Sequence, residues 1–194
     1  MEIIQKFNSF LDRSLSIEII KTRPKEAIKF AKKYFKGKMI TAIEIGVLRG
    51  ENSKEILKNL KIKNLYLVDP WISYEDYSKS EPERTQDSLN IDFKVCRANL
   101  KRYLKKIIWI KDYSEKAITS IKEKVDFIYV DGNHEYKYVK KDLNLYWDLL
   151  NKGGILSGHD IQYVGVSNAV LEFAKEKKLE VHFGERRDWW IIKK

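Results

Sequence analysis

This chain contains little of the cysteine, proline and glycine that mark several classes of protein. Among its 194 residues are 1 cysteine (Cys96), 3 prolines and 9 glycines. One cysteine excludes an internal disulfide framework, and the shortage of proline and glycine excludes collagen-like and low-complexity chains. No apolar run approaches the roughly 20 residues that cross a bilayer, and the start of the chain lacks the apolar segment of a secretory signal. We therefore expect a soluble, cytoplasmic protein.

The remaining composition is that of a globular protein. Hydrophobic residues make up 43% of the chain and aromatic residues 12%, and a chain of this length can bury a full core. We expect a single domain over residues 1–194, with a helical cap at 1–36 and a core at 39–194. The N-terminal helices also offer a surface through which two chains can pair into an oligomer.

Positive charge is concentrated in two stretches of a chain whose formal net charge is +10. Residues 21–38 carry eight basic groups and one acid, and residues 94–111 carry seven basic groups and no acid. Such stretches attract anionic partners such as RNA. They also occur as solvated faces of ordinary helices. We favour this second interpretation and keep nucleic-acid binding as the alternative.

Strand-like and helix-like segments alternate from residue 39 onward. The apolar runs predict strands at residues 39–47, 64–70, 107–112, 125–132, 153–160, 179–185 and 188–194. The segments between them predict helices at 50–60, 84–106, 114–124, from 133 to about 150, and 165–178. Asn52 and Glu55 have the spacing of a capping box at the start of the first of these.

This alternation predicts an α/β fold with a mostly parallel sheet and helices on both faces. The last two strands are close enough to form an antiparallel hairpin around Gly184. In open α/β sheets, ligands bind outside the carboxyl ends of the strands. Four predicted strands end in a carboxylate there, and this shared edge is the predicted active rim: Asp69, Asp112, Asp131 and Asp160.

The first strand runs into the turn "EIGVLRG", which carries Gly46 and Gly50. Glycine lets the backbone approach a ligand closely, and the start of the following helix offers free N–H groups to an anion. Asp69 ends the next strand, where an acid binds ribose hydroxyls in nucleoside-binding folds. The pattern therefore indicates a nucleoside site at the first two strand ends.

Three segments together, "EIGVLRG", "LYLVDPW" and "VDFIYVDGNHEY…LLNKGGILSGHD", resemble class I S-adenosylmethionine-dependent methyltransferases, and the likeness runs through residues 39–194. The resemblance implies a Rossmann-like seven-stranded sheet and S-adenosylmethionine as cofactor. It also implies a methionine end surrounded by Glu44, Gly46 and Gly50, a ribose held by Asp69, and an adenine lined by Asp112, Tyr113 and Ser114.

Residues 125–160 are most similar to the metal-dependent, catechol O-methyltransferase-like branch. There a divalent metal holds the oxygens of the acceptor, and its ligands are usually two acids and an amide. The corresponding residues here are Asp131, His159 and Asp160. Imidazole shifts the preference from magnesium toward manganese or another first-row ion.

His134 stands where that branch carries a lysine as general base, and a neutral imidazole can accept a hydroxyl proton. With Asp131 beside it, the predicted reaction is metal-assisted O-methylation of a small hydroxylated acceptor. Three alternatives stay open: a methyltransferase that acts on RNA, an iron-dependent oxygenase that uses His134, His159 and one aspartate, and a non-enzymatic cofactor-binding module.

Overall fold

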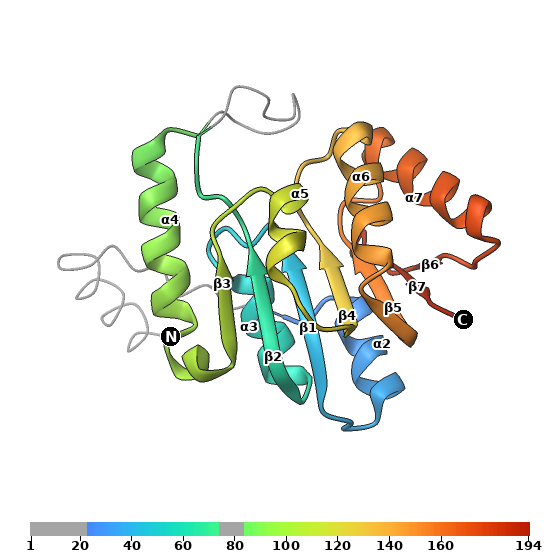
Figure 1. Cartoon of the computed structure of the whole chain (residues 1–194), viewed down its shortest axis with the longest axis horizontal. Helices are drawn as coiled ribbons and strands as arrows, with labels where there is room; N and C mark the ends of the chain where they lie inside the picture. Colours follow the sequence, from blue (N-terminus) through green and yellow to red (C-terminus); the bar gives the residue numbers. More distant parts are fainter. Residues whose placement is uncertain (1–22, 74–83) are drawn as a thin grey trace.

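The computed structural model describes residues 23–73 and 84–194. In this part of the chain, seven strands form one sheet in the order β3-β2-β1-β4-β5-β7-β6 (Figure 1). The strands from β3 to β5 are parallel, whereas β7 runs antiparallel to both β5 and β6. The strands are β1 (Ile40–Ile45), β2 (Ile62–Val68), β3 (Ile107–Ile110), β4 (Val125–Val130), β5 (Leu150–Gly158), β6 (His182–Phe183) and β7 (Trp189–Ile192). The predicted fold class and antiparallel hairpin are confirmed.

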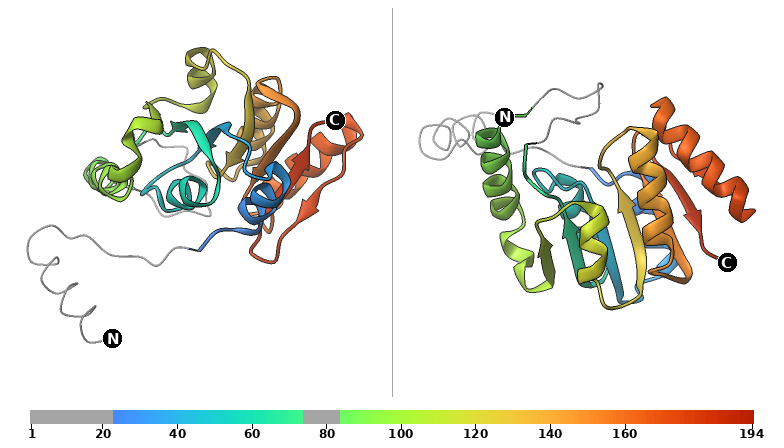
Figure 2. Two further views of the ribbon diagram at one scale, coloured as in Figure 1. Left: turned by 90° about the horizontal axis from the view of Figure 1, so that it is seen from below. Right: turned by 45° about the horizontal axis from the view of Figure 1, so that its top comes forward.

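Helices cover both faces of the sheet, as Figure 2 shows. One face carries α2 (Glu26–Phe35), α3 (Glu51–Asn59) and α4 (Gln86–Asn99), and α4 leads into the 3₁₀-helix η1 (Lys101–Lys106). The other carries α5 (Ser114–Ala117), the 3₁₀-helix η2 (Ile118–Ser120), α6 (Tyr136–Trp147) and α7 (Val164–Lys177). The helix expected at 114–124 is therefore a short α-helix followed by one 3₁₀ turn. The first part of the expected cap, residues 1–22, lies outside the described residues.

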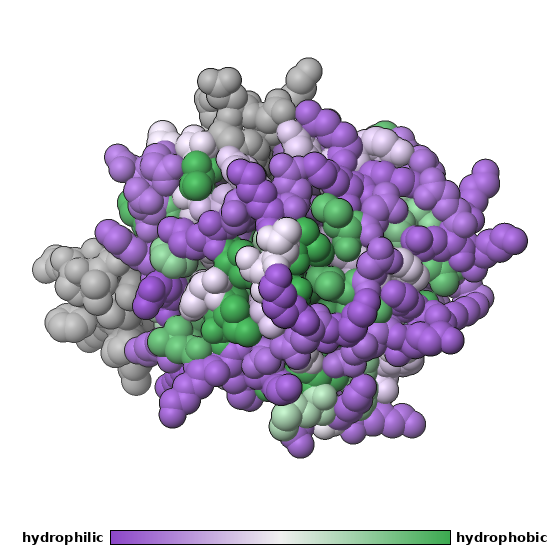
Figure 3. All heavy atoms as spheres, in the orientation of Figure 1, coloured by the Kyte–Doolittle hydropathy of each residue, from purple (hydrophilic) through white to green (hydrophobic). Residues whose placement is uncertain are grey.

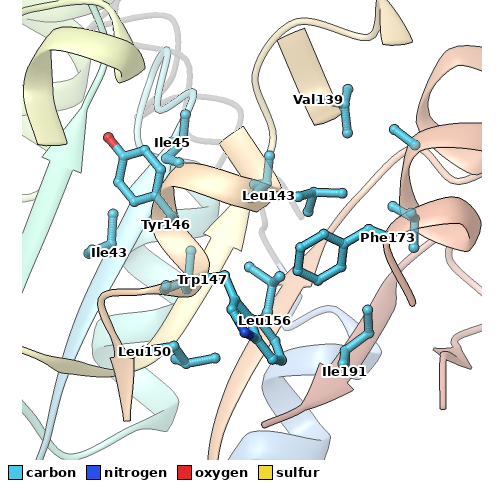
Figure 4. Close-up of a cluster of buried hydrophobic side chains, with 14 of the residues drawn as sticks. Ile43, Ile45, Val139, Leu143, Tyr146, Trp147, Leu150, Leu156, Phe173 and Ile191 are labelled. Atoms are coloured by element: carbon cyan, nitrogen blue, oxygen red, sulfur yellow. The ribbon is translucent and has the colours of Figure 1, made fainter. Parts of the chain in front are cut away.

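The central strands are apolar on both sides because both sides are covered. Successive residues of a strand point to opposite faces, so Ile43 and Ile45 of β1 pack toward α6 while Ala42 packs toward α2 and α3. Figure 4 shows the first of these clusters, in which Leu143 of α6 and Phe173 of α7 meet the strand side chains. The inward face predicted for α7 is confirmed, since all of its members are buried: Val166, Ala169, Val170, Phe173 and Ala174.

The predicted capping box at the start of α3 is wrong. The residue at the N-cap is Gly50, with a left-handed φ of 73° and no side-chain cap. Asn52 lies inside the helix and donates its amide hydrogen to Glu44 at 3.0 Å. The side chain of Asn52, which the spacing predicted to cap the helix, therefore bonds the buried carboxyl group of Glu44 on β1 instead.

The surface is consistent with a protein in contact with water. Hydrophilic side chains cover most of the face seen in Figure 3, and a hydrophobic patch lies near its centre. Within residues 23–73 and 84–194, no helix has both the length and the apolar character needed to cross a membrane.

Candidate active site

A pocket of about 490 Å³ opens at the carboxyl ends of the parallel strands. Its wall is formed by the segments that follow β1, β2, β3 and β4, together with the first turns of α5 and α6. Six of the predicted site residues line it: Gly46, Asp69, Asp112, Tyr113, Ser114 and Asp131. Three of the four carboxylates of the predicted rim thus line the cavity, whereas Asp160 is not among its lining residues.

Gly46 shapes this pocket by close contact between two strand ends. Its φ is +80°, and a Cβ atom there would lie 2.1 Å from the carbonyl oxygen of Asp131. Gly50 is required for helix packing, because a Cβ atom there would lie 2.8 Å from Cys96 Sγ on α4. The first glycine holds β1 against β4 at the pocket, and the second packs α3 against α4.

Asp69 organises the loop at the first strand end. Its Oδ2 accepts hydrogen bonds from the backbone N–H groups of Val47 and Leu48 at 2.8 and 2.9 Å. Its Oδ1 accepts from the backbone N–H of Trp71 at 2.8 Å. The indole of Trp71 is buried and donates to the Leu48 carbonyl at 2.9 Å. Asp69 thus lines the pocket and also ties its two walls together.

Glu44 lies behind the pocket wall rather than in the lining that the described residues form. It is buried on β1, and its carboxylate accepts hydrogen bonds from Ser53 Oγ and from Asn52 at the start of α3. Burial is the main cause that raises the pKa of Glu44, to about 8, and the two hydrogen bonds oppose the shift. Glu44 therefore does not line the pocket itself, and its place beside the methionine end of a cofactor stays a prediction.

On the predicted adenine side, Ser114 is held by a residue that sequence reasoning missed. Ser114 Oγ donates to Asp142 Oδ1 at 2.5 Å, and Tyr146 OH donates to the Ser114 carbonyl at 2.9 Å. Burial raises the pKa of Asp142 to about 7, although the bond from Ser114 lowers it. The available signal was the position of Asp142 on the inward face of α6, three residues after Val139.

A cluster of carboxylates and histidines lies on the other side of Asp131. Asp131, His134 and Asp160 each offer a ligand atom within 4.8 Å of the others. His134 Nε2 is 2.9 Å from Asp160 Oδ2, and the His134 ring stacks on Tyr163 with centroids 4.6 Å apart. The structure therefore brings the predicted base into the group that the predicted metal ligands form. We call Asp131, His134, His159 and Asp160 the carboxylate–histidine cluster.

His159 joins this cluster through its Nδ1, which lies 3.1 Å from Asp160 Oδ1 and 3.7 Å from Asp131 Oδ1. Its Nε2 is 3.0 Å from the Arg186 carbonyl oxygen, to which it can only donate. Burial is the largest single influence on the pKa of His159 and lowers it, but the hydrogen bond with Asp160 and the negative charges of Asp131 and Asp160 together raise it above its ordinary value. His159 thus lies beside both predicted carboxylate ligands, but among the described residues the three whose ligand atoms lie within 4.8 Å of one another are Asp131, His134 and Asp160.

Asp160 is held in an unusual backbone conformation at the centre of this cluster. Its φ is +60°, in the left-handed region that side chains other than glycine rarely adopt. Burial favours its neutral form, yet hydrogen bonds from His134, His159 and Gln162 outweigh burial and hold its pKa well below the usual range. Such strain and charge are typical of functional sites.

Lys25 is, after Asp142, a second residue of this site that the sequence did not indicate. Its Nζ lies 3.0 Å from Asp131 Oδ2 and 5.3 Å from the centre of the Tyr129 ring. It immediately precedes α2, whose start is tied down because the backbone N–H of Ala27 donates to Asp188 at 3.0 Å. Unpaired buried carboxylates are costly, and a bound cation is one way to pair them. Lys25 pairs with Asp131, and two histidines pair with Asp160. Charge balance alone therefore does not require a metal ion at this cluster.

Comparison with known proteins supports the fold and assigns the family. Residues 43–161 match a protein family described as a methyltransferase domain. The chain belongs to this methyltransferase family. The matched span contains every predicted site residue from Glu44 to Asp160, whereas Lys25 precedes it.

One curated relative of this methyltransferase domain is an uncharacterized protein of Acanthamoeba polyphaga mimivirus. The two are 30% identical over 151 residues, which cover 75% of this chain and 62% of the relative. The present chain therefore aligns with less than two thirds of that relative's length.

Solved O-methyltransferases share the fold of this methyltransferase domain. NovP superimposes with a TM-score of 0.65 at 14% identity, covering 87% of this chain and 78% of NovP. An O-methyltransferase from Bacillus cereus in complex with SAH gives a TM-score of 0.59 at 13% identity, covering 99% of this chain and 90% of that chain. At these identities the likeness is one of fold.

Proposed function

We propose that this protein transfers a methyl group from S-adenosylmethionine to a hydroxyl oxygen of a small acceptor. The observation that carries the proposal is the position of Asp131, which lines the pocket and also belongs to the carboxylate–histidine cluster. The pocket and the cluster therefore share a wall, and a methyl donor in one lies beside an acceptor at the other. Membership of the methyltransferase family and the likeness to an O-methyltransferase in complex with SAH, the demethylated form of the cofactor, support this reading.

In the cofactor half, Gly46 lines the pocket at a point where a side chain would not fit. Asp69 is positioned to accept hydrogen bonds from the ribose hydroxyls. Asp112, Tyr113 and Ser114 form the wall that would face the adenine, and Asp142, which also lines the pocket, holds Ser114 in place. The pocket volume of about 490 Å³ lies within the range of ordinary small-molecule sites.

In the acceptor half, His134 is the proposed base. Asp160 Oδ2 lies 2.9 Å from Nε2 of His134, which orients the imidazole and favours the neutral tautomer that carries its proton on Nε2, so Nδ1 would be the nitrogen that accepts a proton. Transfer would break the sulfur–methyl bond of the cofactor and form the oxygen–methyl bond, while His134 would take the proton of the acceptor hydroxyl. The released products are the thioether and the methyl ether, so charge and atoms balance. Alignment of the acceptor with the methyl group supplies a large share of the rate.

The donor set at the cluster also fits a divalent cation. Asp131 and Asp160 would hold the ion, with His159 as the third ligand because its Nδ1 lies within 4 Å of both carboxylates, and imidazole among the ligands favours manganese or another first-row metal over magnesium. A bound cation would lower the pKa of an acceptor hydroxyl and orient it. His134 would remain as the residue that receives the proton.

Calorimetric titration with S-adenosylmethionine and its demethylated product tests the cofactor half. We expect Asp69→Asn to weaken binding of both at least tenfold, or about 1.4 kcal/mol, because an amide cannot accept from the loop N–H groups and the ribose together. Asp148→Asn changes an exposed residue after α6 in the same way and should leave affinity unchanged. Unchanged affinity in a folded Asp69 variant, or tighter binding of NAD than of S-adenosylmethionine, would refute the assignment.

A further inference from the structure

Lys25 carries a positive charge into the acceptor side of the site. Its ammonium lies 3.0 Å from Asp131 Oδ2, and both side chains are only 21% exposed. The Tyr129 ring supports the ammonium from one side at 5.3 Å. An ion pair held in this way is screened less than a surface pair. Lys25 therefore acts on the electrostatics of the cluster and not only on the packing of α2.

The two oxygens of Asp131 face different partners. Oδ2 pairs with Lys25, whereas Oδ1 points toward His159 Nδ1 at 3.7 Å. The backbone of Asp131 is fixed in addition, because its N–H donates to the Ile45 carbonyl at 2.8 Å. Lys25 thus reaches the carboxylate from the start of α2 and leaves one oxygen directed at the cluster.

The ammonium changes the charge that an incoming cation would meet. Asp131 and Asp160 bring two negative charges to the cluster, and Lys25 cancels one of them. A divalent ion that binds Asp131 would also lie within a few ångströms of the ammonium, and like charges at that distance repel strongly inside a protein.

We propose that Lys25 is a specificity-determining residue of the acceptor side, which weakens the binding of divalent cations by holding one oxygen of Asp131. The inference rests on the metal half of the proposed function. In the protein with Lys25 in place, tight retention of a cation requires one more negative charge, and an ionised acceptor oxygen supplies it. Lys25 thereby favours a cation that enters and leaves together with the acceptor over one that is permanently resident.

Titration of the full chain with Mn²⁺, followed by the electron paramagnetic resonance signal of the free ion, tests this proposal. The titration is done at neutral pH with the demethylated cofactor present. We expect Lys25→Met to bind Mn²⁺ at least tenfold more tightly than the unchanged protein, because one nearby positive charge is gone. Lys25→Arg keeps the charge and should bind within about threefold of the unchanged protein. Lys29→Met removes an exposed charge on the same helix, paired with Glu26, and should have no effect.

Each other outcome overturns the proposal in an identifiable way. Equal or weaker Mn²⁺ binding in Lys25→Met would show that Lys25 supports the site rather than weakening it. Equal tightening in Lys29→Met would reveal a general effect of net charge. Absence of Mn²⁺ binding in both the unchanged protein and Lys25→Met would remove the metal half of the proposed function, and the inference with it. Cofactor affinity, measured in a separate titration, reports on the cofactor half alone.

Discussion

Replacing Glu44 by glutamine removes a carboxyl group that is buried between β1 and α3. Glu44 is 1% exposed and bonded to Ser53 and Asn52. Its folded-state pKa is about 8, against 4.5 for an ordinary glutamate, with burial as the largest cause. A glutamine has the same shape and no charge. The side-chain oxygen of Asn52 is buried without a partner among the described residues, so a flip of Asn52 would give the new amide an acceptor.

The change in the free energy of unfolding with pH follows from the pKa of Glu44 in the unfolded and folded states. Below pH 4.5 the carboxyl is neutral in both states, and its contribution to stability is fully present. As the pH rises from 4.5 to about 8, only the unfolded chain ionises, so the stability of the folded protein falls. At about 1.36 kcal/mol for each pH unit, this interval corresponds to a loss of about 5 kcal/mol. That is a large share of the roughly 5–15 kcal/mol that separates folded from unfolded proteins.

Urea denaturation at pH 5, 6.5 and 8 measures this contribution. We expect the free energy of unfolding of the unchanged protein to fall between pH 5 and 8 more steeply than that of Glu44→Gln. The variant should therefore be the more stable of the two at pH 8 by a few kcal/mol, and nearly equal to the unchanged protein at pH 5. Glu180→Gln, on the partly exposed segment before β6, is a matched control and should not alter the slope.

Parallel pH profiles for the two proteins would refute the reasoning, because they would mean that Glu44 is ionised in the folded state at neutral pH. In that case the hydrogen bonds from Ser53 and Asn52 would offset burial, and the pKa of Glu44 would be the same in the folded and unfolded states.

Two further predictions concern the acceptor side and the basic stretches. Once an acceptor is found, His134→Ala should lower the single-turnover rate by roughly 10²–10⁴-fold and leave Mn²⁺ bound, whereas His159→Ala should lose Mn²⁺. Loss of Mn²⁺ in the His134 variant would make His134 a ligand and favour the oxygenase alternative. If residues 21–38 and 94–111 are solvated faces, a generic RNA should bind at micromolar affinity or weaker with a steep dependence on salt, as measured by fluorescence anisotropy. Nanomolar, salt-resistant binding would contradict this and favour a methyltransferase that acts on RNA.

Several predictions depended on local patterns of apolar residues, and the structure forms the strands and helices that these patterns predict. The apolar runs of β1, β4 and β5 are strands because side chains on both faces are buried. The spacing in α7 predicted its inward face because a helix repeats every 3.6 residues. Because β1, β2 and β4 run parallel, their carboxyl ends lie at one edge of the sheet, and the sequence therefore assigned Asp69 and Asp131 to one rim.

Other features of the site depend on where each helix packs against the sheet. The periodic pattern of apolar residues within a helix does not determine that position. Lys25 and Asp131 are 106 positions apart, and they meet because Asp188 ties the start of α2 to the edge of the sheet. Asn52 turns away from its expected cap because a buried Glu44 lies beside it. The sequence by itself determined the fold class and the residues that end its strands, since alternation and handedness act locally. Only the tertiary structure decided how the charges at that rim are paired, because pairing depends on distances between segments far apart in the chain.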